Sequence, residues 1–274
     1  MAKTPIKIII FEVSYYMLME RRLWTREELI LAFSLYLKLP FGKLHHGNPE
    51  IIHLANILDR TPNSIAMRLS NFASVDPYHQ QRGIKGLTGG IKQVEPIWNE
   101  FIHNKEDLLF ESEKILADLE KQTIETKFAD VLSGIENLKG ETKLREVKTR
   151  VNQNVFRQIV LANYNRKCAI TGIDIPDLLV ASHIIPWSQN EIERLNPENG
   201  ICLSALYDRA YDKGLIGITE KYQIILSAEL KVKEKKEFYP STFGNLNGIT
   251  LQLPQKYMPK KEFLQFHLDT VFRG

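Results

Sequence analysis

The chain has 274 residues, 43% of them hydrophobic and 25% charged, which is enough for one large or two ordinary domains with a buried core. Its net charge of +3 is weak evidence for a nucleic-acid partner, so the local distribution of charge matters more. Two cysteines, Cys168 and Cys202, exclude a four-cysteine zinc site and a disulfide framework, and we expect two reduced, buried thiols. The apolar run at 6–19 contains Lys7 and Glu12 and is too short to span a bilayer; with no signal peptide evident, we expect a soluble, cytoplasmic protein.

The first part of the chain, up to about residue 100, carries three short helical patterns. The first opens at Thr25 with a capping box, and its apolar side chains fall on one helical face. The second opens with an Asn-Pro pair at residues 48–49 and the third with a Thr-Pro pair at residues 61–62, and proline at the first helical position is typical of a helix start. The very short turn between the second and third patterns suits a helix-turn-helix.

The third of these helices is expected to turn a polar face outward, made of Asn63, Ser64, Met67, Arg68 and Asn71. Asn and Arg are residue types that read base edges in DNA grooves, so Asn63 and Arg68 are candidate DNA contacts. The alternative is a small three-helix bundle with a polar face, and the sequence leaves both readings open. The Gly-rich basic loop at 76–90 is equally open, because its backbone N–H groups could contact phosphates or it could be a surface loop.

An acidic, strongly helical stretch follows at 104–137, and its apolar seam predicts a linker helix or a dimer helix. The heptad pattern does not persist long enough for a coiled coil. Gly134 and Gly140 mark a boundary. We therefore expect a helical DNA-recognition domain over 1–103, a linker or dimer helix over 104–140, and a further domain over 141–274.

Basic residues gather at the start of that last domain, where residues 139–167 carry eight Lys or Arg against two Glu. The pattern predicts a basic approach followed by a helix. Neutralising phosphates is a large part of DNA affinity, and four side chains are candidates for that role: Arg145, Lys148, Arg150 and Arg157. The alternative is a solvated helix flank, and the proximity of a candidate active site favours phosphate.

That candidate site lies in "ASHIIPWSQNEIERLNPENGICLSALYDRAYDKGLI", residues 181–216. The apolar, β-branched run around His183 predicts a strand, and Pro186 ends it because proline cannot continue a ladder. A polar loop leads to Asn199, after which a second strand runs into a helix that Gly214 stops. The predicted order is therefore strand, loop, strand, helix.

The side chains in this order suit phosphodiester cleavage, which needs a base to deprotonate water and a cation to offset developing negative charge. Neutral imidazole, here His183, is the natural base near pH 7. Asp208 and Asp212 lie one turn apart on the helix and offer the oxygen ligands that a hard divalent cation prefers. Asn199 could hold the other ring nitrogen or fix the loop. A strand histidine, an Asn-Gly turn and a solvated helix face each have ordinary explanations, and their joint order favours a site.

The stretch resembles the HNH nucleases, also called the ββα-metal or His-Me finger group. The similarity covers roughly residues 141–274 and is strongest from "CAITG" through "ASHIIPW" to "NPENGICLSALYDRAYDKGLI". Within that group the chain looks like the bacterial HNH endonucleases associated with restriction of foreign DNA. The stretch "LPQKYMPKKEFLQFH" near the end of the sequence also resembles the C-terminal tail of that subgroup. The resemblance implies a ββα-metal nuclease domain over 141–274. Together with the helix-turn-helix-like pattern of the N-terminal part, the expected fold class is α+β.

The resemblance also implies roles for single residues. His183 matches the general base, and Asn199 matches a middle asparagine that orders the loop. Asp208 falls on the third family position, which is His or Asn in many members and holds the metal; Asp212 would bind the metal or cap the helix. Many members have an Asp directly before the base, where this chain has Ser182, a poorer metal ligand that could leave a water in that place.

We therefore expect a metal-dependent DNA endonuclease that uses Mg²⁺ or Mn²⁺ on double-stranded DNA in restriction or defence, with Arg209 and Arg157 clamping flanking phosphates. Two other readings stay open. One is a DNA-binding regulator with an inactive HNH fold, which Ser182 and the missing third histidine permit. The other is a defence effector nuclease gated by a signal or partner. One HNH site cuts one strand at a time, so double-strand breaks would indicate a homodimer. No membrane contact is expected.

Overall fold

The computed structural model describes residues 22–83, 86–254 and 256–274. The fold mixes helices with two small antiparallel two-stranded sheets. The helices are α2 (Arg26–Lys38), α3 (Pro49–Ile57), α4 (Pro62–Val75), α5 (Pro77–Gln81), α6 (Ile91–Phe101), α7 (Lys105–Leu119), α8 (Ile124–Lys127), α9 (Gly140–Asn163), α10 (Ala205–Asp212), α11 (Ala228–Lys231), α12 (Tyr239–Thr242) and α13 (Lys261–Thr270). The strands are β1 (Leu179–His183), β2 (Gly200–Ser204), β3 (Ile216–Ile218) and β4 (Ile224–Leu226). Short 3₁₀ turns are η1 (Phe41–Lys43), η2 (Thr88–Gly90), η3 (Pro176–Leu178) and η4 (Pro197–Asn199).

The apolar run at 6–19 lies outside the described residues, as do residues 84 and 85 of the Gly-rich loop. In the part of the chain that is described, no helix is both long and apolar enough to cross a bilayer.

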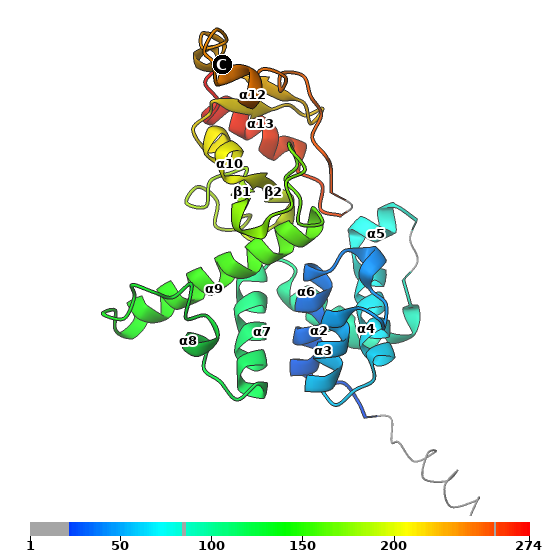
Figure 1. Cartoon of the computed structure of the whole chain (residues 1–274). Helices are drawn as coiled ribbons and strands as arrows, with labels where there is room; N and C mark the ends of the chain where they lie inside the picture. The colour runs from blue at the N-terminus through cyan, green and yellow to red at the C-terminus, as the bar shows by residue number, and fades with distance from the viewer. Residues whose placement is uncertain (1–21, 84–85, 255) are drawn as a thin grey trace, which may run out of the picture.

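We call helices α2 to α7 the helical unit (Figure 1). In it, α4, α6 and α7 pack on α2, while α3 and α5 pack on α4. The expected capping box is present, because the Thr25 side chain accepts from the Glu28 backbone N–H and Glu28 accepts from that of Thr25. The sequence predicted one buried face, but every residue from Leu29 to Leu37 is buried. A helix that is covered on all sides lies at the centre of its unit, and α4, α6 and α7 supply the cover.

The polar face predicted for α4 is only partly present. Asn63 is exposed, as expected. Arg68 is buried because its guanidinium lies 4.7 Å from the Trp24 ring centroid, and Asn71 is buried because its side-chain amide donates to the Leu87 carbonyl at 2.5 Å. The expected outward orientation of Arg68 and Asn71 is therefore wrong. The DNA contact of Arg68 stays a prediction.

The acidic stretch after α6 is not one helix, since α7 ends at Leu119 and turns and the short α8 follow. Its apolar seam is used within the chain, where Leu108 and Leu109 are fully buried. The boundary expected at Gly140 is the start of α9. The basic approach and the helix predicted after it thus form one continuous helix of 24 residues.

Helix α9 lies between the helical unit and the rest of the chain (Figure 1), contacting α2 and α7 as well as β1 and β2. Toward α7, Asn152 is fully buried and its side-chain amide donates to the Glu106 carbonyl at 3.1 Å. Toward the hairpin, Phe156 and Val160 pack so closely under Gly200 that an added Cβ would lie 2.4 Å from Val160 Cγ2. The hairpin therefore sits directly on α9.

We call the elements from β1 to α13 the hairpin unit. Strands β1 and β2 pair from Leu179↔Ser204 to His183↔Gly200, and α10 follows β2 directly and packs on both strands. The strand–loop–strand–helix order predicted from the sequence is thus present. Cys168 and Cys202 are free and buried, as expected.

A buried lysine from the hairpin unit enters the helical unit. Lys256, in the segment before α13, is 1% exposed, and its Nζ lies 3.7 Å from the Tyr36 ring centroid and 4.0 Å from Asp76 Oδ2. The Tyr36 hydroxyl also donates to Asp76. Burial lowers the pKa of Lys256 to about 7, and the negative charge of Asp76 opposes that shift. The two units therefore share a desolvated polar cluster.

Replacing Lys256 with methionine is expected to change how stability depends on pH. Between about pH 7 and pH 10.4 the unfolded lysine holds a proton that the folded lysine lacks, so the free energy of unfolding of the wild type gains up to about 1.4 kcal/mol per pH unit from this residue. Lys256→Met lacks that slope. Urea unfolding at several pH values from 7 to 10 measures it, and parallel curves for the two proteins would contradict the expectation.

Candidate active site

His183 ends β1 and is held on three sides. Its Nε2 lies 2.9 Å from the backbone oxygen of Arg194, and its ring stacks on Phe156 with centroids 4.3 Å apart and meets Trp187 edge-on at 5.5 Å. A carbonyl only accepts, so Nε2 carries the hydrogen and Nδ1 is the basic nitrogen. Burial lowers the pKa of His183, and the bond to Arg194 opposes this. The ring is thus kept neutral and able to accept a proton.

Asn199 is fully buried and clamps the start of the loop that follows β1. Its Oδ1 accepts from the Ile185 backbone N–H at 2.8 Å, and its Nδ2 donates to the Ile185 carbonyl at 3.1 Å. The Asn199 carbonyl accepts from the Ile184 N–H at 3.0 Å. Asn199 could have held the His183 ring or fixed the loop, and these hydrogen bonds favour the second role.

Three candidate metal ligands gather where α10 meets β1. Partial burial raises the pKa of Asp208, while the Ser182 hydroxyl and Arg209 lower it. Partial burial, followed by repulsion from Asp208, raises the pKa of Asp212 although its surface is largely exposed. The Ser182 hydroxyl is buried near Asp208 but makes no hydrogen bond of ordinary geometry within the described structure. Two like charges and an unsatisfied hydroxyl are a combination that a cation would relieve.

The donor chemistry of these residues fits a hard divalent cation, because all three offer oxygen. Within the described ranges, no group of three or more His, Cys, Asp or Glu side chains is arranged to hold a metal ion. Mg²⁺ keeps several waters and is commonly bound through one or two carboxylates, so a partial set suits it. The same set is poor for Zn²⁺, which prefers nitrogen and sulfur ligands.

The C-terminal part of the chain holds α10 in place. The Tyr207 hydroxyl donates to the Thr242 carbonyl at 2.7 Å. Tyr211 is fully buried and stacks on His267 of α13 at 3.7 Å between centroids, and Nε2 of His267 lies 3.1 Å from the Tyr211 carbonyl oxygen. The C-terminal segment around Thr242 and His267 therefore positions the helix that carries Asp208.

The basic residues expected to face phosphates divide into two groups. Arg150 and Arg157 donate to backbone carbonyls of neighbouring segments, and Lys148 lies 2.6 Å from Asp107 on α7. These three are bound within the chain. Arg145 on α9 and Arg209 on α10 are exposed, and neither is in an ion pair among the described residues. Asn63 lies on α4, away from these residues in the sequence.

The sequence analysis missed Arg194. Its carbonyl accepts from His183, its guanidinium lies 4.8 Å from the Trp187 ring centroid, and its Nη2 lies 2.6 Å from Glu106 Oε2. Any residue can supply a carbonyl, so no sequence signal pointed to this acceptor.

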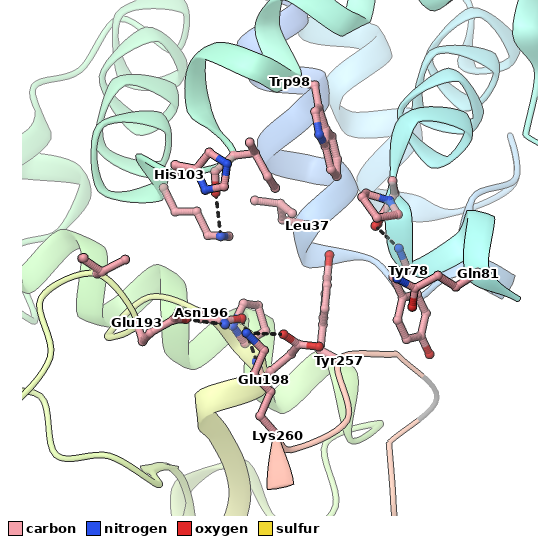
Figure 2. A pocket seen from close by; sticks show the side chains of 16 residues that line it. Leu37, Tyr78, Gln81, Trp98, His103, Glu193, Asn196, Glu198, Tyr257 and Lys260 are labelled. Carbon is pink, nitrogen blue, oxygen red and sulfur yellow. Dashed lines mark hydrogen bonds and ion pairs between the residues drawn. The ribbon is translucent and has the colours of Figure 1, made fainter. Parts of the chain in front are cut away.

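A cavity of about 400 Å³ lies between the loop after β1 and the helical unit (Figure 2). Its lining from the hairpin unit includes Glu193, Asn196, Glu198, Tyr257 and Lys260, and its lining from the helical unit includes Leu37, Trp98 and His103. Ser182, Asp208 and Asp212 are not among the residues that line it. The cavity thus borders the loop that holds His183, and not the metal-ligand side of the hairpin.

Residues 168–219 match the family model described as HNH endonuclease. The match contains β1, β2 and α10, and with them His183, Asn199, Asp208 and Asp212. It confirms the resemblance to HNH nucleases for this part of the chain and indicates nuclease activity in general. No curated protein matches the chain.

Replacing Asn199 with alanine is expected to lower the free energy of unfolding by about 2–4 kcal/mol, because it leaves the buried N–H and C=O of Ile185 without partners. Asn199→Asp keeps the acceptor and loses the donor, so its free energy of unfolding should lie between those of wild type and Asn199→Ala. Urea unfolding measures both. Asn245→Ala, at an exposed position, serves as the control and should stay within about 0.5 kcal/mol of wild type. A loss for Asn199→Ala no larger than the control would contradict the clamp.

Proposed function

We propose that the chain is a metal-dependent endonuclease that hydrolyses phosphodiester bonds of DNA in restriction or another defence against foreign DNA. The observation that carries the proposal is His183, held neutral with Nδ1 as its basic nitrogen on a strand packed against the helix of Asp208. The HNH match over the same residues supports it. The likeness of the C-terminal tail to restriction-associated nucleases supports the defence role.

In the proposed reaction, Nδ1 of His183 takes a proton from a water molecule, whose oxygen attacks phosphorus. The bond from phosphorus to the 3′ oxygen breaks, and that oxygen takes up a proton, which leaves a 5′-phosphate and a 3′-hydroxyl. Phe156 keeps the ring in its plane, and Asn199 keeps the loop that carries its acceptor. Asp208, with Asp212 and Ser182, would hold Mg²⁺ or Mn²⁺, which supplies charge compensation at the phosphate and the leaving oxygen.

Double-stranded DNA is the proposed substrate, and exposed basic side chains beside α10 are proposed to meet its phosphates. Arg209 is exposed on α10, and Lys213 is exposed directly after it. Exposed lysines lie at the end of α11 and just after it, at 231, 233, 235 and 236, and none of them is in an ion pair among the described residues. The contact between Tyr207 and Thr242 ties this segment to α10. Phosphate contact thus falls to these residues and Arg145 more than to Lys148, Arg150 or Arg157.

Plasmid cleavage with Mg²⁺ or Mn²⁺ tests the proposal. Wild type is expected to nick or cut supercoiled DNA only with metal, His183→Ala to lose about 10²-fold or more because the base is absent, and Asp208→Asn to need more metal. His46→Ala, at an exposed position of the helical unit, controls for loss of a histidine. If wild type cuts neither unmodified, modified nor single-stranded DNA, the proposal fails. That result would favour an inactive HNH fold or a nuclease that is gated by a signal or partner.

The salt dependence of DNA binding tests the proposed phosphate contacts. In a His183→Ala background, Lys233→Gln with Lys235→Gln should reduce the slope of log affinity against log salt by about 1–2, because each phosphate contact releases counterions. Lys114→Gln with Lys121→Gln, an equal charge change at exposed positions in and just after α7, should leave the slope unchanged. Fluorescence anisotropy with a short duplex measures it, and equal slopes for the two pairs would exclude the lysine segment as a contact.

A further inference from the structure

The acceptor that sets the tautomer of His183 belongs to a segment with little regular structure. Nε2 of His183 bonds to the backbone oxygen of Arg194 at 2.9 Å. Between β1 and η4 the backbone forms turns, so no strand ladder fixes the position of that carbonyl. The carbonyl of Arg194 orients the His183 ring only if the backbone of Arg194 is itself held in place.

On its other side this segment borders a cavity. Figure 2 shows Glu193 and Asn196 at the edge of the 400 Å³ space, with the Asn196 amide donating to Glu193 at 2.6 Å. Glu193, just before Arg194, and Asn196, two residues after it, thus line an open space, while Leu195 between them is buried in the core. The segment is therefore anchored by Leu195, and the Arg194 side chain supplies a second anchor on the helical unit.

The Arg194 side chain is largely buried and reaches the helical unit. Its guanidinium lies 4.8 Å from the Trp187 ring centroid, and Nη2 lies 2.6 Å from Oε2 of Glu106 in the first turn of α7. The side chains of Arg194 and Glu106 are 17% and 28% exposed. A short, charge-assisted bond that is shielded from water is among the stronger polar contacts in a protein.

Glu106 is a fixed point for this bond. Its backbone oxygen accepts from Asn152 of α9 at 3.1 Å, and its Oε1 lies 3.8 Å from Lys148 of the same helix. Since α9 also carries Phe156, the helix that supports the ring of His183 also fixes the residue that sets the ring's acceptor.

We propose that Glu106 is a positioning residue for His183, acting through Arg194 and linking the helical unit to the active site. The proposal rests on the proposed function for its kinetic consequence. Without Glu106, the Arg194 carbonyl moves relative to the ring, and Nδ1 is no longer held as the basic nitrogen facing the water. Because Glu106 does not touch substrate, its loss affects the rate of the chemical step and leaves DNA binding unchanged.

Glu106→Gln and Asp107→Asn form a matched pair for the kinetic test. Both remove one negative charge from the first turn of α7, and Asp107→Asn breaks the 2.6 Å pair with Lys148 while leaving Arg194 untouched. Glu106→Gln is expected to lower kcat of metal-dependent cleavage about 10-fold or more with KM within about 2-fold, and Asp107→Asn to stay near wild type. Equal kcat values in the two variants, with equal thermal unfolding, would overturn the proposal.

A double variant separates the route through Arg194 from a general loosening of α7. Arg194→Met breaks the same link from the other end. If Glu106 acts through Arg194, the double variant with Glu106→Gln falls no further in kcat than Arg194→Met alone. If the two losses add in free energy, Glu106 acts by another route and the proposal is wrong.

The tautomer of His183 gives a readout that does not depend on cleavage. In protein labelled with ¹⁵N-histidine, the His183 signals are identified by their absence in His183→Ala. Wild type and Asp107→Asn should show the Nε2–H tautomer alone, and Glu106→Gln a mixture. An unchanged tautomer in Glu106→Gln refutes the positioning role. If wild type cuts no DNA, the proposed function fails, and this spectrum still decides whether Glu106 sets the ring.

Discussion

The structure depends on the burial of one helix on two sides. Helix α9 packs on α2 and α7 through one part of its length and under the β1–β2 hairpin through another. Asn152 serves the first contact and Phe156 the second, one turn apart. The close fit at Gly200, where even a methyl group would collide, fixes the hairpin on α9 in one position. The plane of the His183 ring, the loop beyond it and the spacing to α10 all follow from that docking.

The docking of the hairpin on α9 determines which titratable side chains of the site are shielded from water, and this sets the direction of their pKa shifts. His183 lies against α9 and is desolvated, which lowers its pKa and keeps it a base. On the α10 side, partial desolvation raises the pKa of Asp208, and partial desolvation followed by repulsion from Asp208 raises the pKa of Asp212. The site thus combines a desolvated imidazole with two carboxylates of raised pKa. The proposed reaction uses both kinds of group at one phosphate.

The sequence predicted features that are local. Thr25 and Thr61 cap helices within their own first turns, and the order of His183, Asn199 and Asp208 along a strand–loop–strand–helix unit was readable because each neighbour in sequence is a neighbour in space. The burial of Arg68 could not be predicted from the sequence of α4, because the side chain that covers it, Trp24, lies before α2.

Contacts between distant segments account for the other differences. Lys148 and Arg157 looked available to phosphates because sequence shows charge, but carboxylates and carbonyls far along the chain bind them. The sequence did not indicate a role for Arg194 or Lys256. Arg194 contacts His183 through its backbone, and Lys256 is buried against residues about 200 positions earlier in the chain.

The two-sided packing of α9 also limits how the HNH-like segment can be transferred to another protein. That segment, 168–219, carries His183 and the candidate metal ligands but neither Phe156 nor Glu106. Grafted alone onto another protein, it would bring a histidine without the ring that aligns it and a loop without its anchor. A transferred unit that keeps these contacts has to include α7, from Lys105, and also α2, on which α9 packs and whose Tyr36 contacts Lys256.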